Sequence, residues 1–310
     1  QRQMCIRDRC SWQHSAPTTA IRHRQTTNGG IGAMENRILV PLDGTESAEE
    51  ILCYVRSITP KSDTSITLLC VLGKPGDDCS PHAQRINDEL AADGWSVSNE
   101  SRMGDPVDEI VKFSLLQPST MIMMSTHGRT GMERIREGSV TEQVLRQSPC
   151  PVFILHTMRA EPPDRRCENL FRRILVPLDG TKASSAILDC VQRLAKAHDS
   201  EVVIFHDEMV GPEEEERRAA IKTALQDHSV TLANSGLKVT LDMSTYKRPI
   251  REILKKIDDM DIDLVAMASH GEGGERRAME ESVTAEVIRH ANCPLLVWSA
   301  EPQCPPAGNT

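Results

Sequence analysis

The chain has 310 residues, enough for two domains of ordinary size, and its residues are 39% hydrophobic but only 3% aromatic. The formal net charge of -9 argues against a general nucleic-acid binder, which presents a basic surface. No apolar run approaches the roughly 18 residues that a membrane-spanning helix needs. The composition therefore predicts two domains with aliphatic cores, without nucleic-acid or membrane partners.

Residues 1–33 differ from the rest of the chain. They hold five Arg, no Lys and a single acidic residue, Asp8. An Arg-rich, acid-poor leader is also typical of organelle transit peptides. We favour the hypothesis that this leader is disordered or artefactual, because a well-patterned domain begins at Met34. A mature N-terminus upstream of Met34 in natively expressed protein would contradict this hypothesis.

An internal repeat dominates the remaining sequence. Nine residues, Arg37–Thr45, reappear unchanged as Arg173–Thr181, at an offset of 136. A later match, Ser125–Gly128 with Ala268–Gly271, has an offset of 143. The second copy has therefore gained seven residues between these matches, and the acidic run Glu213–Glu216 is where we expect them. Such self-similarity predicts one structural unit written twice.

In the first copy, apolar runs alternate with amphipathic segments. The runs predict strands at Arg37–Leu42, Ser65–Leu72, Trp95–Arg102, Thr120–Ser125 and Val152–Leu155, and the segments between them predict helices at Glu46–Ile58, His82–Asp93, Pro106–Leu116 and Ser139–Arg146. The third strand alternates in polarity, as an edge strand does. Continuous apolar strands joined by helices predict a doubly wound parallel α/β sheet covered on both faces.

The repeat also sets the expected domain boundaries. We expect a first domain, copy one, at residues 34–157, and a second domain, copy two, at residues 171–300. A polar linker with two adjacent prolines, 158–170, joins them, and a proline-rich tail follows at 301–310. The ten cysteines include no CxxC pair and no zinc spacing. We expect them to be small buried residues in a reducing compartment.

Two segments of copy one are candidates for a ligand site. In an open parallel sheet, ligands bind beyond the carboxyl ends of the strands, where strand order reverses. The turn after the first strand carries Asp43, a carboxylate that can accept hydrogen bonds from ribose hydroxyls. The loop after the fourth strand begins at Ser125 and contains Gly128, Gly131 and Gly138. Glycines permit a close approach of the ligand to the backbone.

Further residues of this loop favour a phosphate. Gly138 and Ser139 precede a helix, whose N-terminal N–H groups attract anions. Arg129 can add a charge-assisted hydrogen bond. The alternatives stay open, because glycine-rich loops often only turn corners, Ser139 can be a simple helix cap, and His127 can orient the loop or act as a base. The sequence contains neither GxxxxGK[ST] nor a GxGxxG after the first strand, which argues against a P-loop NTPase and a dinucleotide dehydrogenase.

These motifs resemble those of the universal stress protein family, in a tandem two-domain form. The family motif G-x2-G-x9-G-[ST] reads here Ser125-x2-Gly128-x9-Gly138-Ser139, with Ser at its first position. The family's strand-one Asp matches Asp43. The resemblance covers about Met34 to Ala300, and it implies five-stranded sheets of order 3-2-1-4-5, domains paired through their last strands, a homodimer, and a cytoplasmic role in stress tolerance.

The resemblance also implies a ligand and its contacts. The expected ligand is ATP, alone or with Mg²⁺, and no catalytic or metal-ligating residue is expected. By position, the adenine pocket would be lined by Pro41, Leu42 and Val71, and the phosphates would be held by Gly128, Arg129, Gly138, Ser139 and Val140.

Copy two departs from this motif. Its loop reads Ala268-x2-Gly271-x9-Glu281-Ser282, so that Glu replaces the last Gly. A carboxylate about 4 Å from a phosphate charge near a protein surface costs roughly 4 kcal/mol. We therefore predict that copy two, although it keeps Asp179, binds ATP weakly or not at all.

Three functions remain open. The leading hypothesis is a module that binds ATP in copy one and changes its conformation or assembly state. The second is an enzyme, a slow ATPase or a nucleotidyl transferase of a related α/β superfamily; the Asp43-Gly44-Thr45 turn lacks the strand-one motifs of those transferases, so weak ATP hydrolysis is the most that we expect. The third is a scaffold without nucleotide.

Overall fold

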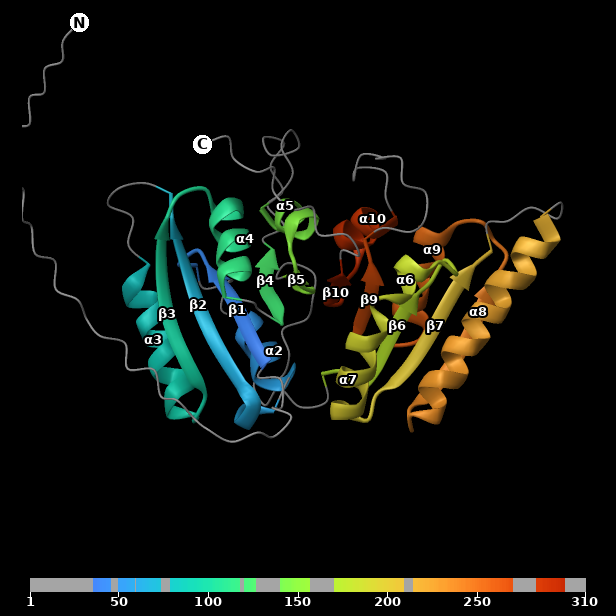
Figure 1. The fold of residues 1–310 in the computed structure, drawn as a ribbon, viewed down its shortest axis with the longest axis horizontal. Coiled ribbons are helices and arrows are strands. Elements are labelled where there is room, and N and C mark those ends of the chain that lie inside the picture. Colours follow the sequence, from blue (N-terminus) through green and yellow to red (C-terminus); the bar gives the residue numbers. More distant parts are fainter. Residues whose placement is uncertain are drawn as a thin grey trace, which may run out of the picture. The chain divides into compact units, whose positions relative to one another are not determined.

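The computed structural model describes residues 36–45, 50–58, 60–73, 79–117, 120–126, 140–156, 170–208, 214–269 and 283–298. These residues lie in one compact unit that begins at Met34 (Figure 1). Within the described ranges, no helix has the length and hydropathy that a membrane crossing requires.

Copy one alternates strands and helices as the sequence predicts. Its elements are β1 (Asn36–Leu42), α2 (Ile51–Ile58), the 3-10 turn η1 (Lys61–Asp63), β2 (Thr64–Leu72), α3 (Ser80–Ala92), β3 (Ser96–Met103), α4 (Pro106–Leu116), β4 (Met121–Thr126), α5 (Val140–Gln147) and β5 (Val152–His156). Asp105 caps α4, because its carboxylate accepts hydrogen bonds from the backbone N–H groups of Val107 and Asp108 at 2.9 and 3.2 Å.

Copy two repeats this order. Its elements are β6 (Arg173–Pro177), α6 (Lys182–Ser185), α7 (Leu188–His198), β7 (Glu201–Asp207), α8 (Glu215–Asn234), β8 (Lys238–Ser244), α9 (Pro249–Asp259), β9 (Leu264–Ala268), α10 (Val283–His290) and β10 (Leu295–Trp298). Helix α8 has 20 residues against 13 in α3, its counterpart in copy one. The seven extra residues therefore lengthen this helix, which begins within the acidic run 213–216.

The strand order in each copy is 3-2-1-4-5, as predicted, but the two sheets are joined. The ten strands form one sheet in the order β3-β2-β1-β4-β5-β10-β9-β6-β7-β8. Strands β5 and β10 pair antiparallel at the centre, with Phe153 opposite Leu296 (Figure 1). All other neighbours pair in parallel, and β3 lies at an edge as expected. The copies thus pair through their last strands within a single chain.

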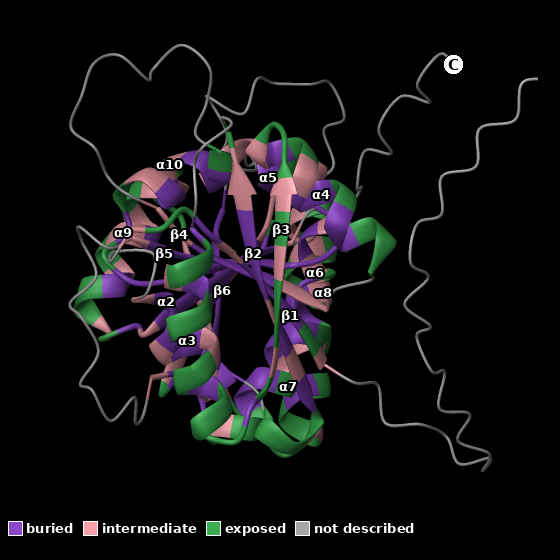
Figure 2. Cartoon of the chain, turned by 90° about the vertical axis from the view of Figure 1, so that its left-hand side faces the viewer, coloured by how far each residue is buried: buried purple, intermediate pink, exposed green. Residues whose placement is uncertain are grey.

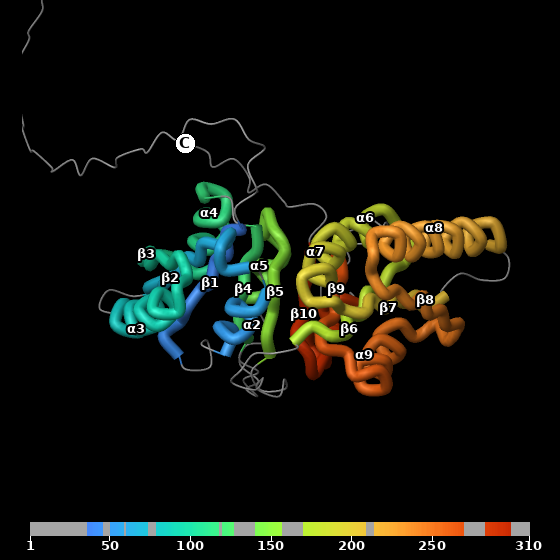
Figure 3. The backbone as a smooth tube through the Cα atoms, turned by 90° about the horizontal axis from the view of Figure 1, so that it is seen from below, coloured from blue at the N-terminus to red at the C-terminus, as the bar shows by residue number. Residues whose placement is uncertain are grey.

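The core consists of two apolar clusters, one on each face of the sheet. Helices α2, α3, α7 and α8 contribute to the first cluster, and helices α4, α5, α9 and α10 to the second. Both clusters contain residues of both copies. In Figure 2 the central strands are buried while the outer face of α3 is exposed, and Figure 3 shows α9 and α8 on opposite sides of β7. Burial of this continuous core is what stabilises the paired arrangement.

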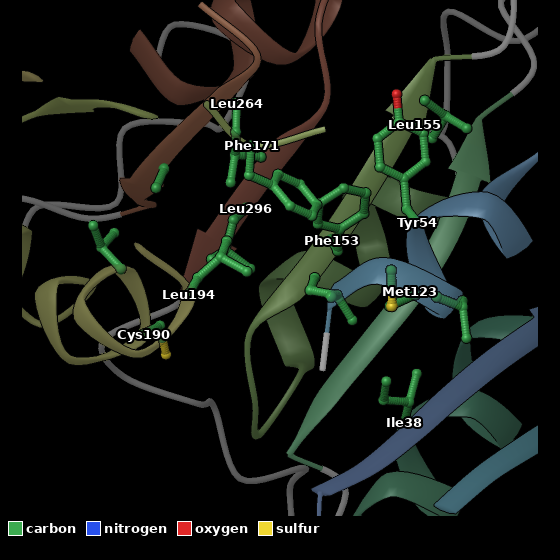
Figure 4. Packing of buried hydrophobic residues seen from close by; sticks show 14 of the residues in the cluster. Ile38, Tyr54, Met123, Phe153, Leu155, Phe171, Cys190, Leu194, Leu264 and Leu296 are labelled. Atoms are coloured by element: carbon green, nitrogen blue, oxygen red, sulfur yellow. The ribbon is translucent and has the colours of Figure 1, made fainter. Parts of the chain in front are cut away.

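Aromatic rings gather where the copies meet, in a chain that has few of them. Phe171, fully buried just before β6, lies 6.1 Å from the rings of both Tyr54 and Phe153 in copy one (Figure 4). The His198 ring, at the end of α7, stands edge-on to Phe171 at 4.9 Å. Burial raises the pKa of Tyr54 to about 12. Burial also lowers the pKa of His198, although hydrogen bonds with the backbone of Ser57 and Ile58 act to raise it. The junction is therefore an aromatic cluster whose Phe171 is fully buried.

Candidate functional site

Strand order reverses between β1 and β4, which is the place where the sequence predicts a site. All seven residues of β1 pair with β2, whereas the pairs between β1 and β4 are Ile38 with Met121 and Leu39 with Ile122. Ladder pairing therefore ends before the carboxyl ends of β1 and β4. The two strands then lead to Asp43 and to the loop 127–139, as in the crevice of other doubly wound sheets.

Asp43 has a structural role that the sequence did not reveal. Its Oδ1 accepts hydrogen bonds from the backbone N–H and the hydroxyl of Thr45, at 3.0 and 2.6 Å. In copy two, Asp179 and Thr181 repeat these bonds at 2.9 and 2.7 Å. One carboxylate oxygen thus orders the turn after the first strand. The other oxygen of the exposed Asp43 makes no hydrogen bond with a described residue, and it can accept one from a ligand.

The structure describes only part of the predicted site. Pro41 and Leu42 end β1, Val71 lies near the end of β2, Ser125 in β4, and Val140 opens α5. The predicted residues outside the described ranges are His127, Gly128, Arg129, Gly131, Gly138 and Ser139.

The side chains at the ends of β1 and β2 are not equally accessible. Leu42 is 4% exposed and belongs to the first core cluster, so that it can offer a ligand its backbone but little side chain. Pro41 and Val71 are half-buried, and Val140 is 39% exposed. Of the three residues expected to line an adenine pocket, Pro41 and Val71 therefore remain the side-chain candidates.

Two cysteines lie beside this site. Cys70 of β2 and Cys79, which precedes α3, have their Cα atoms 6.2 Å apart, a separation that a disulfide can bridge. The expectation of reduced cysteines stays a prediction, and this pair is the place where a disulfide could form instead. Buried thiols are present at Cys150, Cys190 and Cys293, and burial raises the pKa of each of them.

In copy two, a side chain of α8 packs against the turn that follows the first strand. Gly180, in the turn after β6, has a φ of +83°, and a Cβ added there would lie 2.8 Å from Cγ2 of Ile221 in α8. At Gly44 of copy one, with a φ of +79°, the nearest atom of a described residue to such a Cβ is Cβ of Cys79, at 3.6 Å. The lengthened helix α8 thus packs Ile221 against the turn that carries Asp179.

A buried acid replaces an apolar site residue in copy two. The strand registers make Phe205 of β7 the counterpart of Leu69 of β2. Two residues further along β7, Asp207 therefore occupies the position that Val71 has in copy one, and it is 6% exposed. Its Oδ1 accepts hydrogen bonds from the Ser244 hydroxyl at 2.6 Å and from the Tyr246 N–H at 2.9 Å. Sequence reasoning missed this change, although applying the offset of 136 to Val71 would have found it.

We expect Gly180→Ala to destabilise the chain more than Gly44→Ala. Both changes place a side chain at positive φ, a strain of about 1–2 kcal/mol. Gly180→Ala also drives a methyl group into Ile221, and such overpacking adds about 1–3 kcal/mol. Gly236→Ala is the control, because its φ is +94° and nothing lies within 4 Å of the added Cβ. Equal urea midpoints for Gly180→Ala and Gly236→Ala would contradict the packing of Ile221.

Among the described residues, no group of three or more His, Cys, Asp or Glu side chains is arranged to hold a metal ion.

The fold and the site define a doubly wound α/β protein, duplicated in tandem, with a candidate site at the strand-order reversal of copy one.

The comparisons with known proteins give the family. The model of the universal stress protein family matches residues 34–156 and again residues 170–298. The chain belongs to this family, with two tandem units.

Relatives and a solved structure agree with this assignment. A universal stress protein of Methanocaldococcus jannaschii is 28% identical over 148 residues, covering 40% of this chain and 84% of the relative. One of Mycobacterium bovis is 24% identical over 210 residues, covering 65% of this chain and 68% of the relative. The crystal structure of a universal stress protein from Archaeoglobus fulgidus has a TM-score of 0.66 and 25% identity, and the likeness covers 87% of this chain and all of that one.

Proposed function

We propose that this universal stress protein binds ATP, alone or with Mg²⁺, in copy one, and acts as a regulatory or protective module of the stress response. The observation that carries the proposal is the arrangement of Asp43. Thr45 holds one of its carboxylate oxygens, and the other is exposed at the carboxyl end of β1, beside the strand that leads into the glycine-rich loop. A carboxylate fixed in this way can accept hydrogen bonds from a ribose.

The contrast between the copies supports a single site per chain. Asp179 repeats the arrangement of Asp43, so the turn alone does not separate the copies. Ile221 packs against Gly180, and the buried carboxylate of Asp207 stands where Val71 would face an adenine ring. Together with Glu281 in the loop, these changes favour a copy two that stabilises the first copy and binds no ATP.

Asp43→Asn is the variant that tests the proposal. The amide oxygen can replace Oδ1 and keep the Thr45 turn, while the amide NH₂ replaces the oxygen that would accept from the ribose. We expect ATP affinity to fall about tenfold to a hundredfold, because a hydrogen bond to a charged group contributes about 1.5–3 kcal/mol. Calorimetric titration of the full chain measures this loss.

The duplication supplies a matched control. Asp179→Asn makes the same change in copy two, and we expect it to leave ATP affinity unchanged. If Asp179→Asn weakened binding as much as Asp43→Asn, the site would not belong to copy one alone. Turnover of labelled ATP by the same protein would show whether binding is accompanied by slow hydrolysis.

Family membership also favours a cytoplasmic location and a homodimer, and both stay predictions. Because β5 and β10 pair with each other inside the chain, a dimer through the last strands would have to replace this pairing.

A further inference from the structure

A groove bordered by basic residues lies on copy two. It has a volume of about 710 Å³, and its lining includes Lys247, Arg248 and Arg251 at the start of α9, together with Leu254 and, from α10, His290. A second hollow, of about 490 Å³, shares Arg248 and Arg251. These volumes are in the range of small-molecule sites, which run from about 300 to 1,000 Å³.

The described part of the chain offers no counter-ion to the three cations beside this groove. Among the described residues, the side chains of Lys247, Arg248 and Arg251 form no hydrogen bond or ion pair, although the chain as a whole is acidic. The cations further along α9 are paired, Lys255 with Asp259 at 3.8 Å and Lys256 with Asp242. Within α9, the cation without an ion pair to a described residue is thus Arg251, which borders the groove.

Two acidic side chains near the cluster, both within the described ranges, form no ion pair with its three cations. Glu286, which also lines the groove, is engaged by Arg289 at 2.5 Å and by His290 at 3.3 Å. Glu252, in the same helical turn as Arg251, lies beyond ion-pair distance of all three cations. Among the described residues, Lys247, Arg248 and Arg251 thus border the groove without a carboxylate paired to them.

The duplication shows that this charge is not required by the fold. Helices α4 and α9 are counterparts of 11 residues, and both begin at a proline. Arg248 and Arg251 take the places of Asp105 and Asp108, so copy two has Arg where copy one has its helix cap. Cations at a helix N-terminus are unfavourable, because the backbone dipole is positive there. The basic residues thus oppose the stability of α9, which is expected of groups that serve a ligand.

The carboxylate of Asp207 stabilises the conformation of the turn that precedes α9 and carries Lys247 and Arg248. Beyond Ser244 and Tyr246, its carboxylate accepts hydrogen bonds from the backbone N–H groups of Lys247, at 3.3 Å, and of Arg248. Lys247 has a φ of +56°, a left-handed conformation that these bonds stabilise. The residue that replaces Val71 of copy one therefore orders the segment that presents the cations.

We propose that the groove formed by Lys247, Arg248, Arg251 and His290 binds the polyphosphate group of a small anionic ligand. Two or more adjacent phosphates match three neighbouring cations, and guanidinium groups bind phosphate oxygens through paired, charge-assisted hydrogen bonds. Copy two has then exchanged the family's nucleotide pocket for an anion site of its own. This inference does not depend on ATP binding in copy one.

The test is a calorimetric titration of the full chain with inorganic tripolyphosphate at physiological salt. We expect saturable binding to the wild type and a loss of about a hundredfold in R248D/R251D, because removing each guanidinium weakens phosphate binding about tenfold. This variant copies Asp105 and Asp108, so α9 gains a cap and the melting temperature is expected to stay level or rise. Loss of binding can therefore not be assigned to misfolding.

Two further proteins make the result decisive. K196D/K222D changes the net charge equally at exposed positions outside the groove, and Gly138→Glu alters the predicted ATP site of copy one. K196D/K222D is expected to bind tripolyphosphate as the wild type does. Gly138→Glu is expected to keep the site in the groove and to lose only tripolyphosphate held by the loop of copy one. ATP titrated into Gly138→Glu separates a free polyphosphate from a nucleotide-borne one. One ATP site per chain requires that ATP does not bind this variant, so the groove is expected to take the free polyphosphate alone. Absence of binding to the wild type, unchanged binding in R248D/R251D, or equal loss in either control would overturn the proposal.

Discussion

Replacing Gly138 by Glu is expected to lower the ATP affinity of the chain about a thousandfold. The change copies Glu281 of the second repeat into the loop that we predict to hold the phosphates. Two like charges about 4 Å apart near a protein surface repel by roughly 4 kcal/mol, which corresponds to three orders of magnitude in the dissociation constant. Calorimetric titration of wild type and variant measures the difference directly.

Gly138→Gln separates charge from bulk in this experiment. Gln has the size of Glu but no charge, so we expect it to weaken binding much less. The reverse change in copy two, Glu281→Gly, is expected to create no second site, because Ile221 and Asp207 remain in place. If ATP binding survived Gly138→Glu unchanged, Glu281 would not explain the loss of the site in copy two.

The second large effect concerns the junction of the copies. Phe171→Ala is expected to lower the free energy of unfolding by about 3–5 kcal/mol, the usual loss for a fully buried Phe. Phe171 is 0% exposed and faces Tyr54 and Phe153 of the other copy, so the cavity would open where the copies meet. Urea unfolding followed by circular dichroism measures the loss.

Leu116→Ala is a suitable control for this experiment. Leu116 is 76% exposed at the end of α4, and a surface change of this kind is expected to stay within about 0.5 kcal/mol. A loss below about 1 kcal/mol for Phe171→Ala would show that the aromatic cluster does not hold the copies together.

Much of the fold could be predicted because the sequence states it twice. The unchanged Arg37–Thr45 segment, the apolar runs and the switch to helical spacing are local patterns, and they determine strands, helices and strand order. The pairing of β5 with β10 inside one chain is different in kind. Two apolar last strands can pair within a chain or between chains, so the sequence left the choice open until the structure showed Phe153 opposite Leu296.

The candidate site, too, could be predicted from the sequence only in part. Asp43 and the glycines of the loop follow from motif and spacing. The packing of Ile221 on Gly180 depends on where a lengthened helix comes to lie, and the role of Asp207 depends on strand register and on a turn almost forty residues further along the chain. Neither contact is local in sequence, and only the folded chain brings these residues together.

The central claim is that one chain holds one ATP, in copy one. Calorimetric titration of the full-length chain with ATP tests it most directly. Our account predicts one site per chain in the wild type and in Asp179→Asn, and a lost site in Gly138→Glu. Two sites per chain, or no binding by the wild type, would contradict it.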